Sequence, residues 1–228
     1  MKSDDIIIPA YLPTKNHHEL LHRSIKSLEK QTFKDFGVIV VLNGCYTDYD
    51  SIIESVKTSL DIKWLTIEGK ASGAIARNKG IKHSNTIYIA QLDADDQYHP
   101  DKLKKQIEYF QKNPKVSFVG TLAFDWHSDE KQTESCFKVG QYEDHTSIAQ
   151  RLPHECIMCH GSIMFRRDHF LQLNGYNEKN KPGELWSEYG RIMWEDWDLW
   201  TRAVQSGYRF YNIQERLYYW SVHTGVER

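Results

Sequence analysis

The chain has 228 residues, of which 40% are hydrophobic, 26% charged and 13% aromatic, which is typical of a soluble globular protein with one α/β domain or two small ones. The formal net charge is −2, so no overall cationic field exists to hold nucleic acid or an anionic membrane. We therefore expect no nucleic-acid partner.

The N-terminal residues contain no pattern of an export signal. Asp4 and Asp5 precede an apolar run at 6–8 that is too short for the core of a signal peptide. Nothing along the chain approaches the roughly 20 apolar residues of a transmembrane helix. These features predict a cytoplasmic protein, in which the four cysteines stay reduced.

One cysteine pattern has several interpretations. Cys156, Cys159 and His160 form C-x-x-C-H, the pattern of covalent haem attachment, which requires an exported protein. A zinc site that adds His154 is conceivable but lacks a second distant pair of ligands. Free thiols in a buried segment are the interpretation that we favour.

The predicted elements alternate between strands and helices, which indicates a largely parallel sheet with helices on both faces. Apolar runs predict strands, and apolar residues at helical spacing predict helices. In chain order we expect strand 6–10, a helix around 20–28, strand 37–42, a helix at 52–60, strand 62–67, helix 73–83, strand 86–90, helix 101–113, strand 117–124, a polar irregular stretch at 125–152, strand 162–165, helix 167–174, a loop at 179–192, helix 194–206 and strands 208–213 and 217–222.

Polar side chains follow several of the predicted strands. Tyr11 follows the first strand, Asn43 the second, and Asp93 and Asp95 the fourth. In open α/β sheets, ligands bind in the crevice beyond the carboxyl ends of the strands. The sequence therefore predicts a binding site at this edge of the sheet.

The aspartates predict a divalent cation at that site. No G-x-G-x-x-G or P-loop pattern is present to hold phosphates. Mg²⁺ or Mn²⁺ accepts carboxylate oxygens and often bridges them to substrate phosphates. The alternative is that Asp95 and Asp96 cap the following helix, but Asp93 lies too far upstream for that task.

Six motifs together resemble glycosyltransferase family 2, the inverting nucleotide-diphospho-sugar transferases of the GT-A fold. They run in the order IIIPAY (6–11), SLEKQTF (27–33), ARNKGI (76–81), YIAQLDADD (88–96), MFRR with a later Gly-Tyr (164–176) and EDWDLW (195–200). The resemblance covers nearly the whole chain. It implies a single GT-A domain with a Rossmann-like, mostly parallel central sheet, in which 1–124 bind the nucleotide-sugar and 125–228 bind the acceptor.

The resemblance also implies residues for the donor site. The nucleotide-sugar would be bound by Pro9, Tyr11, Asn43, Arg77, Asp93, Ala94 and Asp95. Tyr11 could stack on the base, and a plain turn and a solvated helix arginine are the alternatives for Asn43 and Arg77. Asn43 departs from the family, which usually has an aspartate that reads uracil; an amide oxygen accepts the same hydrogen bond without charge assistance.

By the same resemblance, Asp95 and Asp93 would bind Mn²⁺ or Mg²⁺, and His223 could be a further metal ligand, although a surface histidine is an equal alternative. Asp196 resembles the general base of the family and Glu195 a residue that orients it or binds the acceptor. Acids at the start of a helix also suit its dipole, which is the structural alternative for both.

Four tryptophans crowd the segment that carries these acids: Trp186, Trp194, Trp197 and Trp200. Core packing is the default for at least two of them. Trp186 lies in a predicted loop and Trp194 begins the predicted helix, so we assign these two to acceptor binding.

The function predicted from the resemblance is metal-dependent, inverting transfer of a sugar from a nucleotide-diphosphate donor, with UDP-sugars favoured. The acceptor would be a hydroxyl of a glycan or lipid-linked molecule in surface polysaccharide or lipopolysaccharide biosynthesis, with peripheral association at the cytosolic face of the membrane. A sugar nucleotidyltransferase and a non-catalytic binding module are the alternatives. The first usually needs a Gly-rich loop after the first strand, which is absent, and the second does not need a base.

Overall fold

A computed structural model describes residues 4–12, 15–127, 132–134, 141–179 and 194–222 of the chain. Its strands are β1 (Asp4–Tyr11), β2 (Phe36–Asn43), β3 (Ile62–Ile67), β4 (Tyr88–Gln91), β5 (Gln97–Tyr98), β6 (Val116–His127), β7 (Gln132–Glu134), β8 (Met164–Arg166) and β9 (Arg209–Val222). Its helices are α1 (Lys15–Glu29), α2 (Tyr49–Ser55), α3 (Gly73–Lys82), α4 (Lys102–Lys112), α5 (His145–Arg151), α6 (Arg167–Gln172) and α7 (Glu195–Gln205), with a 3-10 turn at His160–Ser162.

Within the described residues these strands form one sheet in the order β3-β2-β1-β4-β8-β6-β9-β5, with β7 paired to β6. The first four strands along the chain are mutually parallel. β8 runs antiparallel to both β4 and β6, whereas β9 is parallel to β6. The predicted α/β sheet is confirmed, and its antiparallel pairings are made by β5, β7 and β8.

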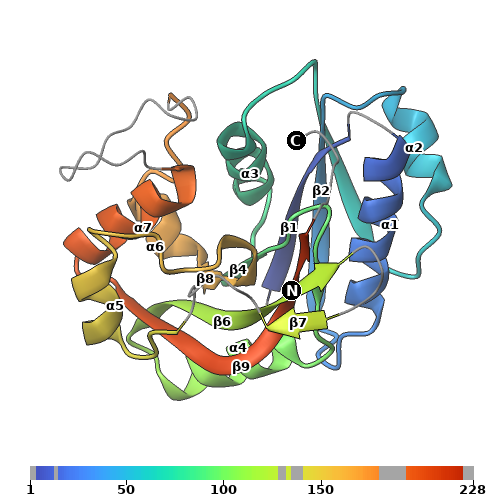
Figure 1. Ribbon diagram of the computed structural model, residues 1–228. Helices are drawn as coiled ribbons and strands as arrows, with labels where there is room; N and C mark the ends of the chain where they lie inside the picture. Colours follow the sequence, from blue (N-terminus) through green and yellow to red (C-terminus); the bar gives the residue numbers. More distant parts are fainter. Residues whose placement is uncertain (1–3, 13–14, 128–131, 135–140, 180–193, 223–228) are drawn as a thin grey trace.

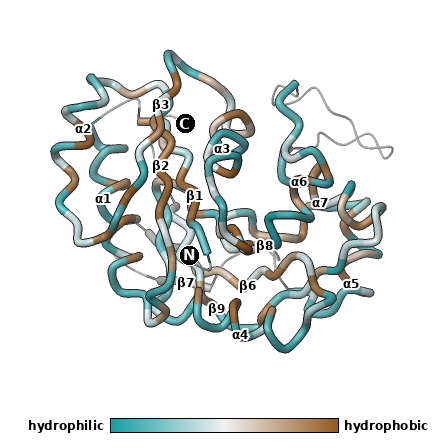
Figure 2. The backbone as a smooth tube through the Cα atoms, turned by 180° about the vertical axis from the view of Figure 1, so that it is seen from behind, coloured by the Kyte–Doolittle hydropathy of each residue, from teal (hydrophilic) through white to brown (hydrophobic). Residues whose placement is uncertain are grey.

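Alternating side chains of the central strands supply two hydrophobic cores. Ile6 and Ile8 face a core shared with α1 and α4, while Ile7 faces a core shared with α3, α6 and α7. Figure 1 shows α1 and α2 on one side of β1 and β2 and α3 on the other. The apolar character of these strands is visible as brown segments in Figure 2, as expected for strands that are covered on both faces.

Helix α3 lies unusually close to the sheet. A Cβ atom at Gly80 would lie 2.6 Å from Cγ2 of Ile7, so a side chain at this position would push the helix away from β1. The absence of that side chain sets the depth of α3 in the fold. This depth matters because α3 carries Arg77.

Several element boundaries differ from the sequence-based expectations. The two strands expected at 208–213 and 217–222 form one strand, β9, because it pairs with β6 along its whole length; Gln214 and Glu215 are accommodated by a register shift opposite Thr121 and Leu122. The helix expected at 52–60 ends at Ser55. The stretch expected to be irregular at 125–152 contains the end of β6, β7 and α5.

Across the described ranges, no helix has both the length and the apolar character needed to cross a bilayer.

Candidate active site

The ends of β1 and β2 bring Tyr11 and Asn43 together, since they are direct partners in the register of the parallel pair. Tyr11 is 37% exposed, and the Lys70 ammonium lies 4.3 Å from the centre of its ring. Pro9, two residues earlier in β1, is half-buried. An aromatic face beside a lysine is a suitable wall for a nucleotide.

The side chain of Asn43 is turned into the protein. Its Nδ2 donates to the Ala71 carbonyl at 2.9 Å, and its Oδ1 accepts from the Ala71 N–H at 2.7 Å. Only 3% of the residue is exposed. Asn43 therefore ties the end of β2 to the loop that precedes α3.

The turn after β4 carries three aspartates, Asp93, Asp95 and Asp96, which we call the turn cluster. The Asp96 N–H donates to the Asp93 carbonyl at 3.1 Å, which closes the turn. Asp96 is buried, and its carboxylate accepts from the Tyr218 hydroxyl and, at 2.6 Å, from the Ser221 N–H. Asp96 thus holds β9 against the turn, and the cap position of α4 is filled by Asp101. Burial, followed by the nearby Asp95 and Asp93, raises the pKa of Asp96 well above its ordinary value.

Asp93 and Asp95 remain at the open side of the turn cluster. The Asp93 side chain is 32% exposed and Asp95 is half-buried. The Asp95 carbonyl accepts a hydrogen bond from the Ser221 hydroxyl, which fixes the backbone of the turn. The structure therefore separates one buried aspartate, Asp96, from two that are partly exposed.

The first turn of α7 carries a second group of acids, Glu195, Asp196 and Asp198, which we call the helix cluster. Asp196 accepts from the Trp197 N–H at 2.7 Å through Oδ1, and the Cys156 thiol lies 3.9 Å from Oδ2. Burial and the charge of Glu195 raise the pKa of Asp196 to about 6. A carboxylate with this pKa is suited to accept a proton near neutral pH.

Arg77 joins the two clusters. Its guanidinium donates to Asp93 Oδ1 at 2.7 Å and to Glu195 Oε1 at 2.8 Å, from a position in α3 that is 8% exposed. Burial opposes the charge of Arg77, but Asp93 and Glu195 outweigh it and raise its pKa, so the residue stays a cation. Burial favours the neutral form of Asp93 and so raises its pKa. The charge of Arg77 outweighs this effect, and the pKa of Asp93 lies below its ordinary value. The alternative of a solvated helix arginine is wrong.

Gly73 leaves space for the Arg77 side chain because it has no Cβ atom. A Cβ atom at Gly73 would lie 2.5 Å from an Arg77 terminal nitrogen and 3.2 Å from Glu195 Oε1. The sequence reasoning missed Gly73, because a glycine at the start of a helix does not reveal what passes over it. It also missed Asn78, although the residue lies in the quoted ARNKGI motif.

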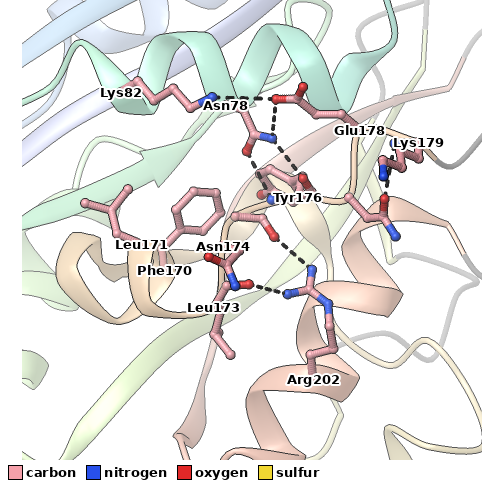
Figure 3. A pocket seen from close by; sticks show the side chains of 12 residues that line it. Asn78, Lys82, Phe170, Leu171, Leu173, Asn174, Tyr176, Glu178, Lys179 and Arg202 are labelled. Carbon is pink, nitrogen blue, oxygen red and sulfur yellow. Dashed lines mark hydrogen bonds and ion pairs between the residues drawn. The ribbon is translucent and has the colours of Figure 1, made fainter.

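Asn78 binds the turn after α6. Its Nδ2 donates to the Tyr176 carbonyl at 2.8 Å and to Glu178 at 2.9 Å, and its Oδ1 accepts from the Tyr176 N–H at 3.0 Å. Figure 3 shows these bonds beside a groove of about 790 Å³ between α3, α6 and α7. The groove is lined by none of the predicted site residues. Asn78 holds α3 and the Tyr176 turn together.

The C-x-x-C-H segment lies close to both acidic clusters. Cys156 contacts Asp196, and burial, followed by the charge of Asp96, raises the pKa of Cys159 to about 12. Burial and the nearby Arg77 lower the pKa of His160 to about 3, so its imidazole is neutral; its Nε2 lies 2.8 Å from the Tyr176 hydroxyl. Cys45, Cys156 and Cys159 form no disulfide bond.

No three His, Cys, Asp or Glu side chains gather in a metal-binding group anywhere in the described part of the chain. This includes the zinc set considered at His154, Cys156, Cys159 and His160. His223, the predicted further metal ligand, lies outside the described residues.

The tryptophans divide between core and surface. Trp197 and Trp200 are buried in the core on the α7 side of the sheet, as the default interpretation predicts. Trp194 precedes α7 and is 53% exposed, immediately before Glu195. Trp186 lies outside the described residues.

Comparisons with known proteins bear on the family and the fold of the chain. Residues 5–173 match the sequence profile of "Glycosyl transferase family 2". The O-antigen biosynthesis glycosyltransferase WbnJ of Escherichia coli is 28% identical over 95% of this chain and 80% of its own length.

Solved structures share the fold. Staphylococcus aureus TarS 1–349 in complex with UDP-GlcNAc superposes with a TM-score of 0.73 at 18% identity, over 99% of this chain and 60% of that one. The mannosyltransferase PcManGT of Pyrobaculum calidifontis, in complex with GDP-Man and Mn²⁺, superposes with a TM-score of 0.69 at 16% identity, over 98% of this chain and 58% of that one. The present chain therefore spans about three-fifths of these solved proteins, and the expected GT-A fold is confirmed.

Proposed function

Because the chain belongs to glycosyl transferase family 2, we propose that it transfers a sugar from a nucleotide-diphosphate donor to a hydroxyl group of a glycan or lipid-linked acceptor. The observation that carries the proposal is the Arg77 bridge, which joins the turn cluster to the helix cluster at 2.7 and 2.8 Å. Asp93, proposed to bind the donor, would thereby share one site with Asp196, the candidate base that follows Glu195.

The donor would lie across the ends of β1, β2 and β4, between Tyr11 and the turn cluster. Pro9, Tyr11, Arg77 and Ala94 would line this part of the site, which belongs to the half of the chain proposed to bind nucleotide-sugar, 1–124. Structural neighbours are complexed with UDP-GlcNAc and with GDP-Man, which supports a nucleotide-sugar donor. Uridine remains our preferred base, on the family resemblance.

The turn cluster fits Mn²⁺ or Mg²⁺. Such ions are commonly held by one or two carboxylates, with substrate phosphates and water completing the shell. Asp95 and Asp93 would hold the ion, because both are only partly buried, whereas Asp96 is buried and committed to β9. When bound, the ion would supply positive charge that stabilises the departing nucleoside diphosphate.

Asp196 would be the general base. It would accept the proton of the acceptor hydroxyl while that oxygen bonds to the anomeric carbon and the bond from this carbon to the diphosphate oxygen breaks. A single displacement of this kind inverts the anomeric configuration, and its transition state resembles an oxocarbenium ion. Glu195 is bound to Arg77, so its role would be to raise the pKa of Asp196 and to fix the start of α7.

The acceptor would approach over the start of α7, in the half proposed to bind it, 125–228. Trp194 is exposed there and offers a flat apolar face on which a sugar ring can stack. The name of the E. coli relative supports a role in surface polysaccharide or lipopolysaccharide assembly. With a lipid-linked acceptor, the protein would work at the cytosolic face of a membrane.

The test is the release of nucleoside diphosphate from a panel of sugar nucleotides in the presence of Mn²⁺, with wild type compared with Asp95→Ala and Asp196→Ala. Asp198→Asn is the matched control, because Asp198 lies in the same helix turn but pairs with Arg202. We expect both alanine variants to lose turnover and the control to keep it. Equal rates in all four proteins would contradict the mechanism.

Binding without turnover would favour a non-catalytic module, and pyrophosphate release from a nucleoside triphosphate would favour a nucleotidyltransferase.

A further inference from the structure

The orientation of Asn43 bears on how the donor base is selected. Both of its bonds go to the backbone of one residue, Ala71, through Nδ2 at 2.9 Å and Oδ1 at 2.7 Å. A carboxamide has one edge on which a donor and an acceptor lie side by side, and this pair of bonds uses it. That edge is therefore occupied by protein and is not presented to a base.

The amide satisfies both Ala71 groups, and an ionised carboxylate does not. An ionised aspartate here would accept from the Ala71 N–H, but its second oxygen would face the Ala71 carbonyl, and two acceptors cannot bond to each other. With 3% of the residue exposed, water would not relieve this contact. The departure from the usual aspartate of the family thus has a structural reason in this chain.

The loop that Asn43 holds, residues 68–72, shapes two parts of the site. Lys70 lies over the Tyr11 ring, and a Cβ atom at Gly44 would lie 3.0 Å from this ring and 3.3 Å from Cβ of Lys70. At the other end of the loop, Ser72 caps α3 by accepting from the Ile75 N–H at 3.3 Å. Loop 68–72 therefore connects the Tyr11 wall to the helix that carries Arg77.

We propose that Asn43 is a positioning residue, which locks loop 68–72 to the end of β2, and that its side chain does not select the donor base. It acts through Ala71 on the Tyr11–Lys70 wall and on the start of α3. This inference rests on the proposed function in that the ligand is a nucleotide-sugar.

The isosteric variant Asn43→Asp distinguishes two roles of this side chain: holding loop 68–72 to β2, and hydrogen bonding to the donor base. A buried carboxyl that faces a carbonyl is favoured in its protonated form, because the hydroxyl can donate where the amide did, and its pKa is raised. Protonation restores the lock, so the defect of the variant is expected to shrink as the pH falls. A side chain that reads uracil would instead gain from a charged oxygen, and the variant would favour uridine.

The experiment measures dissociation constants of UDP, GDP, ADP and CDP with Mn²⁺ by calorimetry, for wild type, Asn43→Asp and the control Asp48→Asn. Asp48 caps α2 five residues along the chain, and asparagine is an equally good cap. We expect Asn43→Asp to weaken all four ligands about tenfold at pH 8, equivalent to about 1.4 kcal/mol, with their order unchanged and the loss reduced at pH 6. The control should match wild type.

A change in the order of the four nucleotides, or a specific gain for UDP, would overturn the proposal. The lock is also testable in the wild-type protein, by hydrogen exchange of the Asn43 side-chain amide. We expect protection both without nucleotide and with UDP, and protection that appears only with UDP would overturn the proposal. If wild type bound none of the four nucleotides, the proposed function would fail. Protection of the Asn43 side-chain amide in the nucleotide-free protein tests the bond to Ala71 independently of that function.

Discussion

The turn cluster and the helix cluster consist of the same kinds of residue, yet their members have different tasks. In each cluster one acid is bound by Arg77: Asp93 in the first and Glu195 in the second. In each, another acid is committed to structure, since Asp96 binds β9 and Asp198 pairs with Arg202 at 2.8 Å. Asp95 and Asp196 are the members that we assign to chemistry. Spacing along the chain does not distinguish these roles, whereas partners from other elements do.

The largest effect is expected at the proposed base. Asp196→Asn keeps the shape of the side chain but cannot take a proton, so turnover should fall by about 10³-fold while binding of nucleoside diphosphate stays within about twofold. Steady-state release of nucleoside diphosphate and calorimetry measure the two quantities. Undiminished turnover would assign the base to another residue and remove the functional difference between the clusters.

The next effect is expected at the turn cluster. Asp95→Asn should lower Mn²⁺-dependent turnover by about 100-fold, equivalent to about 2.7 kcal/mol of transition-state stabilisation. Titration of Mn²⁺ with both proteins, before and after chelation by EDTA, measures this loss. An enzyme that is indifferent to EDTA, with an active Asp95→Asn variant, would show that the turn cluster holds no ion.

The pH dependence sharpens the contrast between Asp196 and its neighbour. Because the pKa of Asp196 is raised to about 6, the base is increasingly protonated below this pH, and turnover should fall about tenfold per unit. Glu195→Gln removes a negative charge that raises this pKa, so the acidic limb of the profile should move to lower pH. Rates of both proteins between pH 4.5 and 8 test this, and a limb that does not move would contradict the assigned role of Glu195.

The smallest effect is expected at Asp198. Asp198→Asn weakens a partly exposed ion pair with Arg202, so the free energy of unfolding should change by less than about 1 kcal/mol. Turnover should stay within about twofold of wild type. Urea denaturation with the same activity assay checks both, and a loss of turnover comparable to that of Asp196→Asn would show that the helix cluster acts as one unit.

Much of the fold was predictable because apolar patterning is a local property. The strand and helix alternation of the first 124 residues followed from it, as did the placing of Tyr11, Asn43 and Asp93 at strand ends. The continuous β9 was not predictable in the same way. Its continuity depends on pairing with β6, in which a register shift absorbs Gln214 and Glu215.

The roles of the site residues were less predictable. Arg77 was expected to bind the nucleotide-sugar, and it also bonds to Asp93 and Glu195, which lie 16 and 118 positions away along the chain. Asn43 was expected to face a base, and it faces Ala71. Cys156 was noticed for a cysteine motif, and it lies against Asp196.

By itself, the sequence determined which residue types lie at each strand end and helix start. The reason is that the periodicity of strands and helices depends on residues that are close together in the sequence. Only the tertiary structure decided which acid is buried and which is paired with Arg77. The physical reason is that the pKa and the hydrogen bonds of a carboxylate depend on burial and on charges within a few ångströms, and most of those charges come from distant parts of the chain.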